Sequence, residues 1–477
     1  MTMRAVIVLS ATLIAGACRP VIRQNAAVPV PVPEQWATAT TEPSAEFPDW
    51  RELFGDPQLA SLIDEALEAN PDIDAAAARL DRSLAQARIA GADLYPQVNA
   101  NFDAARRKQN FIGLPIPGAE DRVLSNTSTT FATGLNVSWE ADLWGRIRSG
   151  QTAARADAAA VSEDLDAARL SLSGQVARLW FSVLESQQQM QLASETRTNR
   201  RETADLVRRR YEAGLTSAVE VRLAESNTSA AEARLELRRR QLDSARRQLE
   251  ILLGRYPTAA IEGGSLPTPG RVIPAGVPAT VLARRPDLRA AERRALAASA
   301  RVAQARASLY PQLRLTASGG TSTNELRNLL DGDFSVWSIM SNLVQPIFQG
   351  GRLRAGIDAA SAGEREVLAV FASTALQAFA EVESALFADD ALARQERALA
   401  AAADHAREAQ RSAEQRYTAG LAEYLSVLES QRQAFEIESQ LLDARRQRLI
   451  ARVDLYLALG GDAREPDPEL TVSEDVE

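Results

Sequence analysis

The feature that most constrains this fold is an internal duplication. Residues 71–98 and 286–313 match without a gap at an offset of 215 positions, and both end in Leu-Tyr-Pro-Gln followed by an aliphatic residue. The pattern Arg-Tyr-x-Ala-Gly-Leu occurs at 210–215 and again at 416–421. Such repetition indicates one body built from two similar halves. Each half reads as a helix, a strand pair and then long helices, which favours a structural conduit over a catalytic pocket.

The composition argues against several classes of enzyme and binding site. The chain has one histidine, His405, and one cysteine, Cys18, so Cys/His zinc sites and a Ser-His-Asp triad are not expected. Its net charge of −9 disfavours nucleic acid as a partner. No Gly-rich phosphate loop is present in the sequence. We therefore expect a protein that is not an enzyme and that needs no cofactor or metal.

The amino terminus predicts export and lipidation. An apolar stretch follows Arg4 and ends in small residues before Cys18, which is typical of a bacterial lipoprotein signal over 1–17. Ala15 stands where that pattern favours leucine, and an ordinary signal peptide is the alternative. Arg19, rather than aspartate, resembles the signal for transfer to the outer membrane. Acyl chains such as palmitate would anchor the protein through Cys18.

Two segments are too proline-poor and too long for ordinary globular helices. Residues 146–210 and 352–416 contain no proline, and each would extend about 95 Å as a helix. Apolar residues recur every seven positions in two phases, which predicts helices that pack against neighbours on both sides as in coiled coils. A tube of helices and a solid bundle both fit this pattern. Gly214 and Gly420 predict the reversals, since glycine readily ends a helix.

Between the helices lie four segments of alternating polarity. They are predicted as strands at 95–108, 128–140, 310–320 and 334–345. These lengths suit tilted membrane-spanning strands, which need about 9–11 residues. Four strands cannot enclose a lumen, and open sheet edges cannot face lipid. Either the strands form a small soluble sheet, or several copies of the chain pool them.

Taken together, these features resemble the TolC/OprM-like outer-membrane efflux proteins. The duplicated plan, the two Leu-Tyr-Pro-Gln strings, the two Arg-Tyr-x-Ala-Gly-Leu tips and the closing Leu-Ala-Leu-Gly-Gly carry the resemblance over about residues 50–462. The start of the chain is similar to the lipid-anchored, NodT-type branch that serves resistance-nodulation-division pumps. The resemblance implies a mainly α fold with a small β part. It further implies a homotrimer in which long antiparallel hairpins form an α-barrel and four strands per chain form a twelve-stranded β-barrel.

The resemblance also implies a location and partners. The trimer would lie in the outer-membrane lipid, extend into the periplasm and export small molecules passively. It would act with a periplasmic adaptor (membrane fusion) protein and an inner-membrane pump. A conduit for type I protein secretion and a coiled-coil lipoprotein spacer without a pore remain as alternatives.

A periplasmic gate at the hairpin tips follows from the same resemblance. Tyr417 takes the position of a tether, Glu220 that of its acidic partner, and Glu429 that of an acidic ring. Ser426 stands where an aspartate is common, so only one acidic ring is expected. The remaining tip residues expected to shape the reversals, with the two arginines as substitute tethers, are Arg210, Tyr211, Gly214, Arg416 and Gly420.

The expected domain organisation follows the duplication. It consists of a signal peptide at 1–17, a lipidated linker at 18–50, a first repeat at 51–270 with a hairpin at 146–253, a second repeat at 271–462 with a hairpin at 352–459, and an acidic disordered tail at 463–477.

Overall fold

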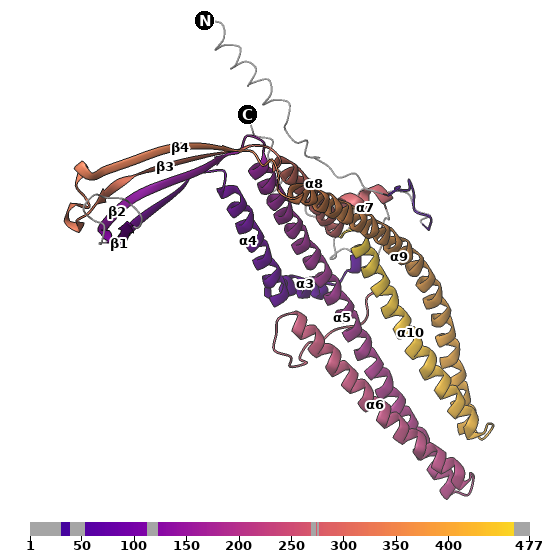
Figure 1. Ribbon diagram of the computed structural model, residues 1–477. Helices are drawn as coiled ribbons and strands as arrows, with labels where there is room; N and C mark the ends of the chain where they lie inside the picture. Colours follow the sequence, from indigo (N-terminus) through magenta and orange to yellow (C-terminus); the bar gives the residue numbers. More distant parts are fainter. Residues whose placement is uncertain (1–29, 39–52, 112–122, 269–272, 274–275, 462–477) are drawn as a thin grey trace. The chain divides into compact units, whose positions relative to one another are not determined.

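A computed structural model describes residues 30–38, 53–111, 123–268, 273 and 276–461. The predicted signal peptide, Cys18 and the acidic tail lie outside these ranges. The elements, labelled as in Figure 1, are α3 (Pro57–Ala69), α4 (Pro71–Ala92), β1 (Gln97–Phe111), β2 (Leu124–Ala141), α5 (Arg146–Glu212), α6 (Ala218–Leu252), α7 (Pro278–Arg284), α8 (Pro286–Ala307), β3 (Gln312–Thr323), β4 (Ser335–Val344), α9 (Arg352–Thr418) and α10 (Tyr424–Ala458). Two short 3₁₀ turns, Leu326–Asn328 and Gly332–Phe334, separate β3 from β4.

The duplication is visible in the lengths of the helices. The long helices α5 and α9 each have 67 residues, their return helices α6 and α10 each have 35, and α4 and α8 each have 22. In each half the long helix and its return helix run antiparallel as a hairpin (Figure 1). The predicted class, mainly helical with four strands and long helical hairpins, is confirmed.

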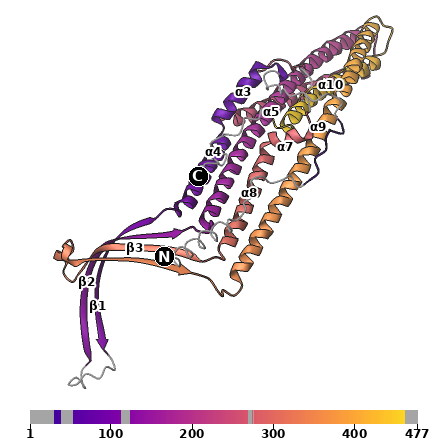
Figure 2. The same cartoon turned by 90° about the horizontal axis from the view of Figure 1, so that it is seen from above.

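The four strands form one antiparallel sheet in the order β1-β2-β3-β4. The β1–β2 pairing runs from Gln97 opposite Ser138 to Phe111 opposite Leu124, whereas the β2–β3 pairing stops at Phe131 opposite Thr323. The β1–β2 hairpin therefore continues beyond the four-stranded part as a two-stranded ribbon, which Figure 2 shows as a long curved pair.

Two compact units divide the chain, and each draws on both repeats. One contains 81–160 and 292–370, with the sheet and the adjoining helix segments. The other contains the described residues within 30–80, 161–291 and 371–461, with the hairpin tips. The long helices α5 and α9 contribute to both units, since the division falls within α5 after residue 160 and within α9 after residue 370.

Part of the predicted linker is packed against a helix rather than free. Trp36 is buried, and its ring lies edge-on against Phe379 of α9 with centroids 6.1 Å apart. The carboxylate of Glu383, one turn further along α9, accepts the backbone N–H groups of Ala37 at 2.6 Å and Thr38 at 3.0 Å. These contacts fix residues 36–38 on α9.

Candidate functional site

The sheet has one apolar face. Side chains alternate between the two faces along each strand, and the strand pairing places the apolar ones of neighbouring strands opposite one another. The cross-strand row Val98, Val137, Ala317 and Ile339 is typical of this face. Ile339 is 76% exposed and Trp337 is 78% exposed, which is the opposite of a soluble core. The apolar side chains on this face are Val98, Ala100, Phe102, Ala104, Phe131, Leu135, Val137, Trp139, Ala141, Leu313, Leu315, Ala317, Trp337, Ile339 and Leu343.

The opposite face is mainly polar and carries its own hydrogen bonds. Asn136 donates to the Asn101 side chain at 2.7 Å, and the hydroxyls of Ser318 and Ser338 are 2.8 Å apart. The guanidinium of Arg314 lies 3.6 Å from the carboxylate of Glu140. A sheet that is apolar on one face and polar on the other suits a wall between lipid and water.

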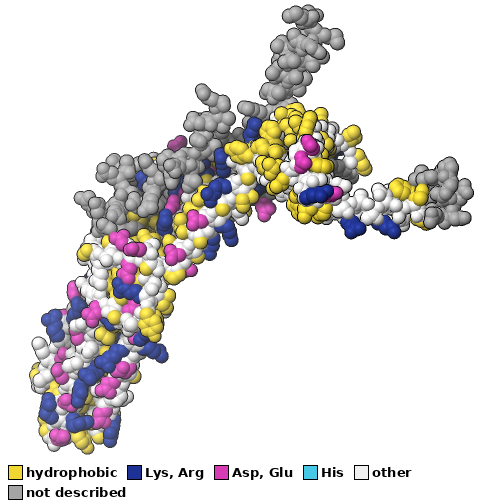
Figure 3. All heavy atoms as spheres, turned by 90° about the vertical axis from the view of Figure 1, so that its left-hand side faces the viewer, with side chains coloured by type: hydrophobic (Ala, Val, Ile, Leu, Met, Phe, Trp, Pro, Cys, Tyr) yellow, Lys and Arg dark blue, Asp and Glu magenta, His cyan; other side chains and the backbone are white. Residues whose placement is uncertain are grey.

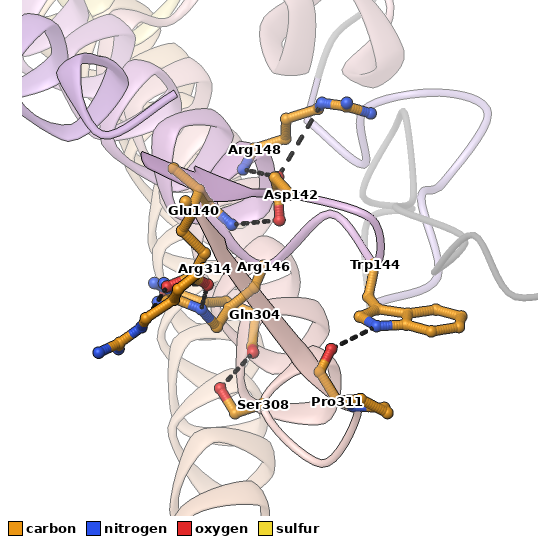
Figure 4. A network of polar contacts seen from close by, with 10 residues as sticks. Glu140, Asp142, Trp144, Arg146, Arg148, Gln304, Ser308, Pro311 and Arg314 are labelled. Carbon is orange, nitrogen blue, oxygen red and sulfur yellow. Dashed lines mark hydrogen bonds and ion pairs between the residues drawn. The ribbon is translucent and has the colours of Figure 1, made fainter. Parts of the chain in front are cut away.

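Polar contacts and aromatic rings fix the junction between strands and helices (Figure 4). Arg146 donates to Glu140 through Nε and Nη2 at 3.1 and 2.8 Å, and this salt bridge ties the start of α5 to β2. Asp142 caps α5 by accepting the backbone N–H groups of Ile147 and Arg148. The Trp144 indole donates to the carbonyl of Pro311 at 2.8 Å, so the two repeats are joined at this level.

Both hairpin tips use the same glycine-based turn. The Leu215 N–H bonds to the Arg210 carbonyl and the Gly214 N–H to the Tyr211 carbonyl, each at 2.8 Å. The second tip repeats these bonds between Leu421 and Arg416 and between Gly420 and Tyr417. The glycines have φ values of +74° and +76°. This is a Schellman motif, which needs a residue in the left-handed region.

The structure brings Arg210 of the first tip to Tyr417 of the second. Arg210 Nη1 donates to the Tyr417 carbonyl at 2.7 Å, and its guanidinium lies 4.8 Å from the centre of the tyrosine ring. A charged hydrogen bond and a cation–π contact thus join the two hairpins of one chain. Tyr417 is 3% exposed and belongs to a buried cluster, the tip cluster, of Val207, Ala224, Tyr417, Tyr424 and Val427.

Glu220, which the family resemblance makes the acidic partner of the tip tyrosine, lies close to the tip cluster. It accepts a hydrogen bond from the Thr216 hydroxyl, and its N–H faces the Ser217 side chain that caps α6. Burial, followed by the nearby Glu220 charge, raises the pKa of the Tyr417 phenol. The phenol therefore stays protonated above the usual pH range for tyrosine, next to the half-buried Glu220 carboxylate.

The remaining predicted gate residues face outward in a single chain. Glu429 is exposed and pairs with Arg432 at 2.6 Å, and this partner lowers the pKa of the Glu429 carboxyl. Ser426 and Arg416 are also exposed. Tyr211, the counterpart of Tyr417, is 47% exposed and lies outside the tip cluster. The two tips therefore share a backbone turn but differ in how their tyrosines pack.

Sequence reasoning missed two polar links between α5 and α10. Buried Gln431 has its amide nitrogen 2.7 Å from Asn199 Oδ1 and 3.0 Å from Glu414 Oε1. A cavity of about 180 Å³ adjoins this layer. Further along, Gln189 donates to the Ser439 carbonyl and accepts from its hydroxyl. The only available signal was a polar residue near the seven-residue apolar stripe, which does not reveal its partner. In the part of the chain that the structure describes, no cluster of His, Cys, Asp and Glu could hold a metal ion.

Comparisons with known proteins agree with this arrangement. A family model described as "Outer membrane efflux protein" matches residues 62–255 and 277–461, which are most of the two repeats. The pyoverdine export outer membrane protein OpmQ of Pseudomonas putida is 34% identical over 442 residues, covering 91% of this chain and 93% of that protein. Outer membrane protein OprJ of Pseudomonas aeruginosa is 34% identical, covering 95% of each.

A solved structure extends the likeness to three dimensions. The open state of the MtrE outer membrane channel of Neisseria gonorrhoeae has a TM-score of 0.81 and 31% identity, covering 93% of this chain and 98% of that one. The resemblance, the outer-membrane location and the efflux role expected from the sequence are confirmed by these comparisons. The chain belongs to the outer membrane efflux protein family and is an outer-membrane channel component of an efflux system.

Proposed function

We propose that three copies of this chain form a gated, passive conduit, anchored by acyl chains on Cys18, that receives small molecules from a periplasmic adaptor and an inner-membrane pump. The observation that carries the proposal is the two-faced sheet with two open edges. Its apolar face is exposed, and the described strands leave β1 and β4 each with a neighbour on one side only.

The open edges supply the argument for several copies. Unpaired backbone groups cannot face lipid, so β1 of one copy would pair with β4 of the next until the wall closes. A closed barrel of twelve strands needs three copies of a four-stranded sheet. Helix α9 also exposes apolar side chains, with Val370, Leu376 and Phe387 each more than half accessible. Neighbouring copies would cover them.

The hairpin tips are the proposed gate. The Arg210–Tyr417 link closes the two hairpins of one chain onto each other, with Glu220 beside it. Three Glu429 carboxylates around a threefold axis would repel one another, attract cations and favour opening once the links are lost. The tips would open when the tip cluster separates.

The same tips offer a surface for the adaptor. Leu215 is 68% exposed and Leu421 is 71% exposed, at equivalent positions directly after the two glycine turns. In a trimer these leucines would form a ring of six apolar knobs. Such a ring fits a partner that presents matching apolar grooves, with the pump supplying the energy and choosing the cargo.

Single-channel conductance in planar bilayers tests this function. Arg210→Ala removes the hydrogen bond and the ring contact, whereas Arg209→Ala removes an exposed neighbour with no side-chain partner in the described chain. Since a hydrogen bond to a charged group contributes about 1.5–3 kcal/mol, we expect Arg210→Ala to raise the open probability roughly tenfold or more. Arg209→Ala should match wild type.

The outcomes separate the competing functions. Conductance by both variants, with more frequent opening only for Arg210→Ala, supports the gated conduit. Absence of any conductance from wild type, Arg210→Ala and Glu429→Ala would show a spacer without a pore.

A further inference from the structure

The β1–β2 ribbon carries three consecutive basic residues, Arg106, Arg107 and Lys108. Their register partners are Thr129, Ser128 and Thr127, so the facing strand contributes no charge. No ion pair or hydrogen bond joins these three side chains to the part of the chain that the structure describes. Figure 3 shows basic side chains standing out along the slender strand hairpin.

The strand alternation assigns these residues to different faces. Val98, Ala100 and Phe102 lie on the apolar face, and the same parity continues through Ala104 to Arg106 and Lys108. Arg107 has the parity of Asn99 and Asn101, on the polar face. The outward pair therefore continues the apolar face, whereas Arg107 continues the opposite one.

The position of Arg106 and Lys108 along the strand is measured from the last apolar row of the apolar face. That row is Ala104 opposite Phe131, and Phe131 in turn pairs with Thr323. At about 3.4 Å per residue, Arg106 lies roughly 7 Å and Lys108 roughly 14 Å further along the strand. This end of the sheet is the one away from the strand–helix junction at Glu140 and Arg146. If the apolar face meets lipid, the pair stands at the level of the outer-leaflet headgroups.

We infer that Arg106 and Lys108 form a binding surface for phosphorylated glycolipid headgroups of the outer leaflet. The inference rests on the proposed membrane barrel. Two unpaired cations, directly beyond an apolar band, complement a lipid that presents acyl chains below and phosphate above. The hydroxyls of Thr127 and Thr129 beside them can donate to the same phosphate oxygens. A trimer would present three such surfaces around its circumference.

Native mass spectrometry of the full-length protein tests the inference. The purified protein is titrated with lipid A carrying two phosphates, with the same lipid carrying one phosphate, and with phosphatidylcholine. We expect wild type to bind the bisphosphorylated lipid most tightly. Each basic residue near an anionic surface raises the affinity about fivefold. Arg106→Gln should therefore weaken binding of the bisphosphorylated lipid about fivefold, and the Arg106→Gln/Lys108→Gln variant about 30-fold.

Arg107→Gln is the matched control, since it removes the same charge from the same strand on the other face. It should bind the lipid as wild type does. Equal losses for Arg106→Gln and Arg107→Gln, or no preference of wild type for phosphorylated over neutral lipid, would overturn the inference. The spectra also report the number of chains, and conductance in neutral lipid reports the pore. A trimer that conducts but ignores phosphate refutes only this inference, whereas loss of trimer and pore refutes the proposed function.

Discussion

At the scale of the residue, the charge of Glu429 depends on its neighbour Arg432. Arg432 lowers the pKa of this carboxyl through a hydrogen bond and its positive charge. A lowered pKa keeps the carboxylate ionised at pH values below the usual glutamate pKa of about 4, and its charge is lost only as pH falls through the lowered value. If Glu429 lines the proposed gate, its cation preference should therefore persist to lower pH than an unpaired glutamate would allow.

We predict that Arg432→Gln moves the loss of cation selectivity to higher pH, because the Glu429 carboxyl then returns toward its ordinary pKa. Reversal potentials across a salt gradient, measured from pH 7 to pH 3, give the midpoint. Arg411→Gln breaks a similar exposed pair with Glu408, three residues away, and should leave the midpoint unchanged. An identical midpoint in all three proteins would contradict a role for Glu429 at the constriction.

At the scale of the element, the reversals depend on glycine conformation rather than on space. An added Cβ at Gly214 meets nothing within 4 Å, yet its φ is +74°. Gly214→Ala should therefore destabilise the first hairpin by about 1–2 kcal/mol through backbone strain alone. Gly356→Ala makes the same chemical change in open space within α9, where φ is not positive, and should stabilise by about 1 kcal/mol.

Apparent Tm values at one scan rate check this pair of substitutions, with Gly214→Ala expected below wild type and Gly356→Ala at or above it. A shift of the same sign and size in both would mean that the turn does not require a left-handed residue.

Sequence patterns predicted the elements well because their signals are local. Pro96 and Pro311 follow the ends of α4 and α8, and the glycines at 214 and 420 mark the reversals. The alternation of polarity likewise predicted the strands, although β1 extends to Phe111 and β2 begins at Leu124, beyond the predicted limits. Apart from Phe111 and Leu124, those extra residues are polar on both faces, so alternation could not reveal them.

Contacts between helices that are distant in the sequence were harder to predict. Tyr417, Glu220 and Arg210 were identified as tip residues, but the sequence did not indicate that Arg210 bonds to the Tyr417 backbone. Every residue has a backbone carbonyl, so the residue type at position 417 does not predict this hydrogen bond. The packing of Tyr424 and the Gln431 layer depends on which helices become neighbours, and a seven-residue repeat on every helix does not specify this.

At the scale of the whole molecule, lipid anchoring and barrel formation should be separable. Cys18→Ser removes the only thiol, and therefore any acyl chain bound to it, but leaves every strand residue unchanged. We predict that the variant still partitions with membranes and remains trimeric in detergent. Intact-mass measurement should show the loss of acyl chains, and light scattering should give the number of chains. A soluble monomer would contradict the assignment of the strands to a membrane wall.

The unlike tyrosines of the two tips have a consequence for symmetry. If the two tips of each chain packed alike, the six hairpins of a trimer could be held closed by six equivalent contacts. Here the tip tyrosine is buried only in the second repeat, as Tyr417, whereas its counterpart in the first repeat, Tyr211, is exposed. In the proposed gate, the two hairpins of one chain would therefore have different roles, one held in place and the other providing the closing contact. In the proposed trimer, closing the gate would then need three such links, not six, and each link would form within one chain before its neighbours assemble around it.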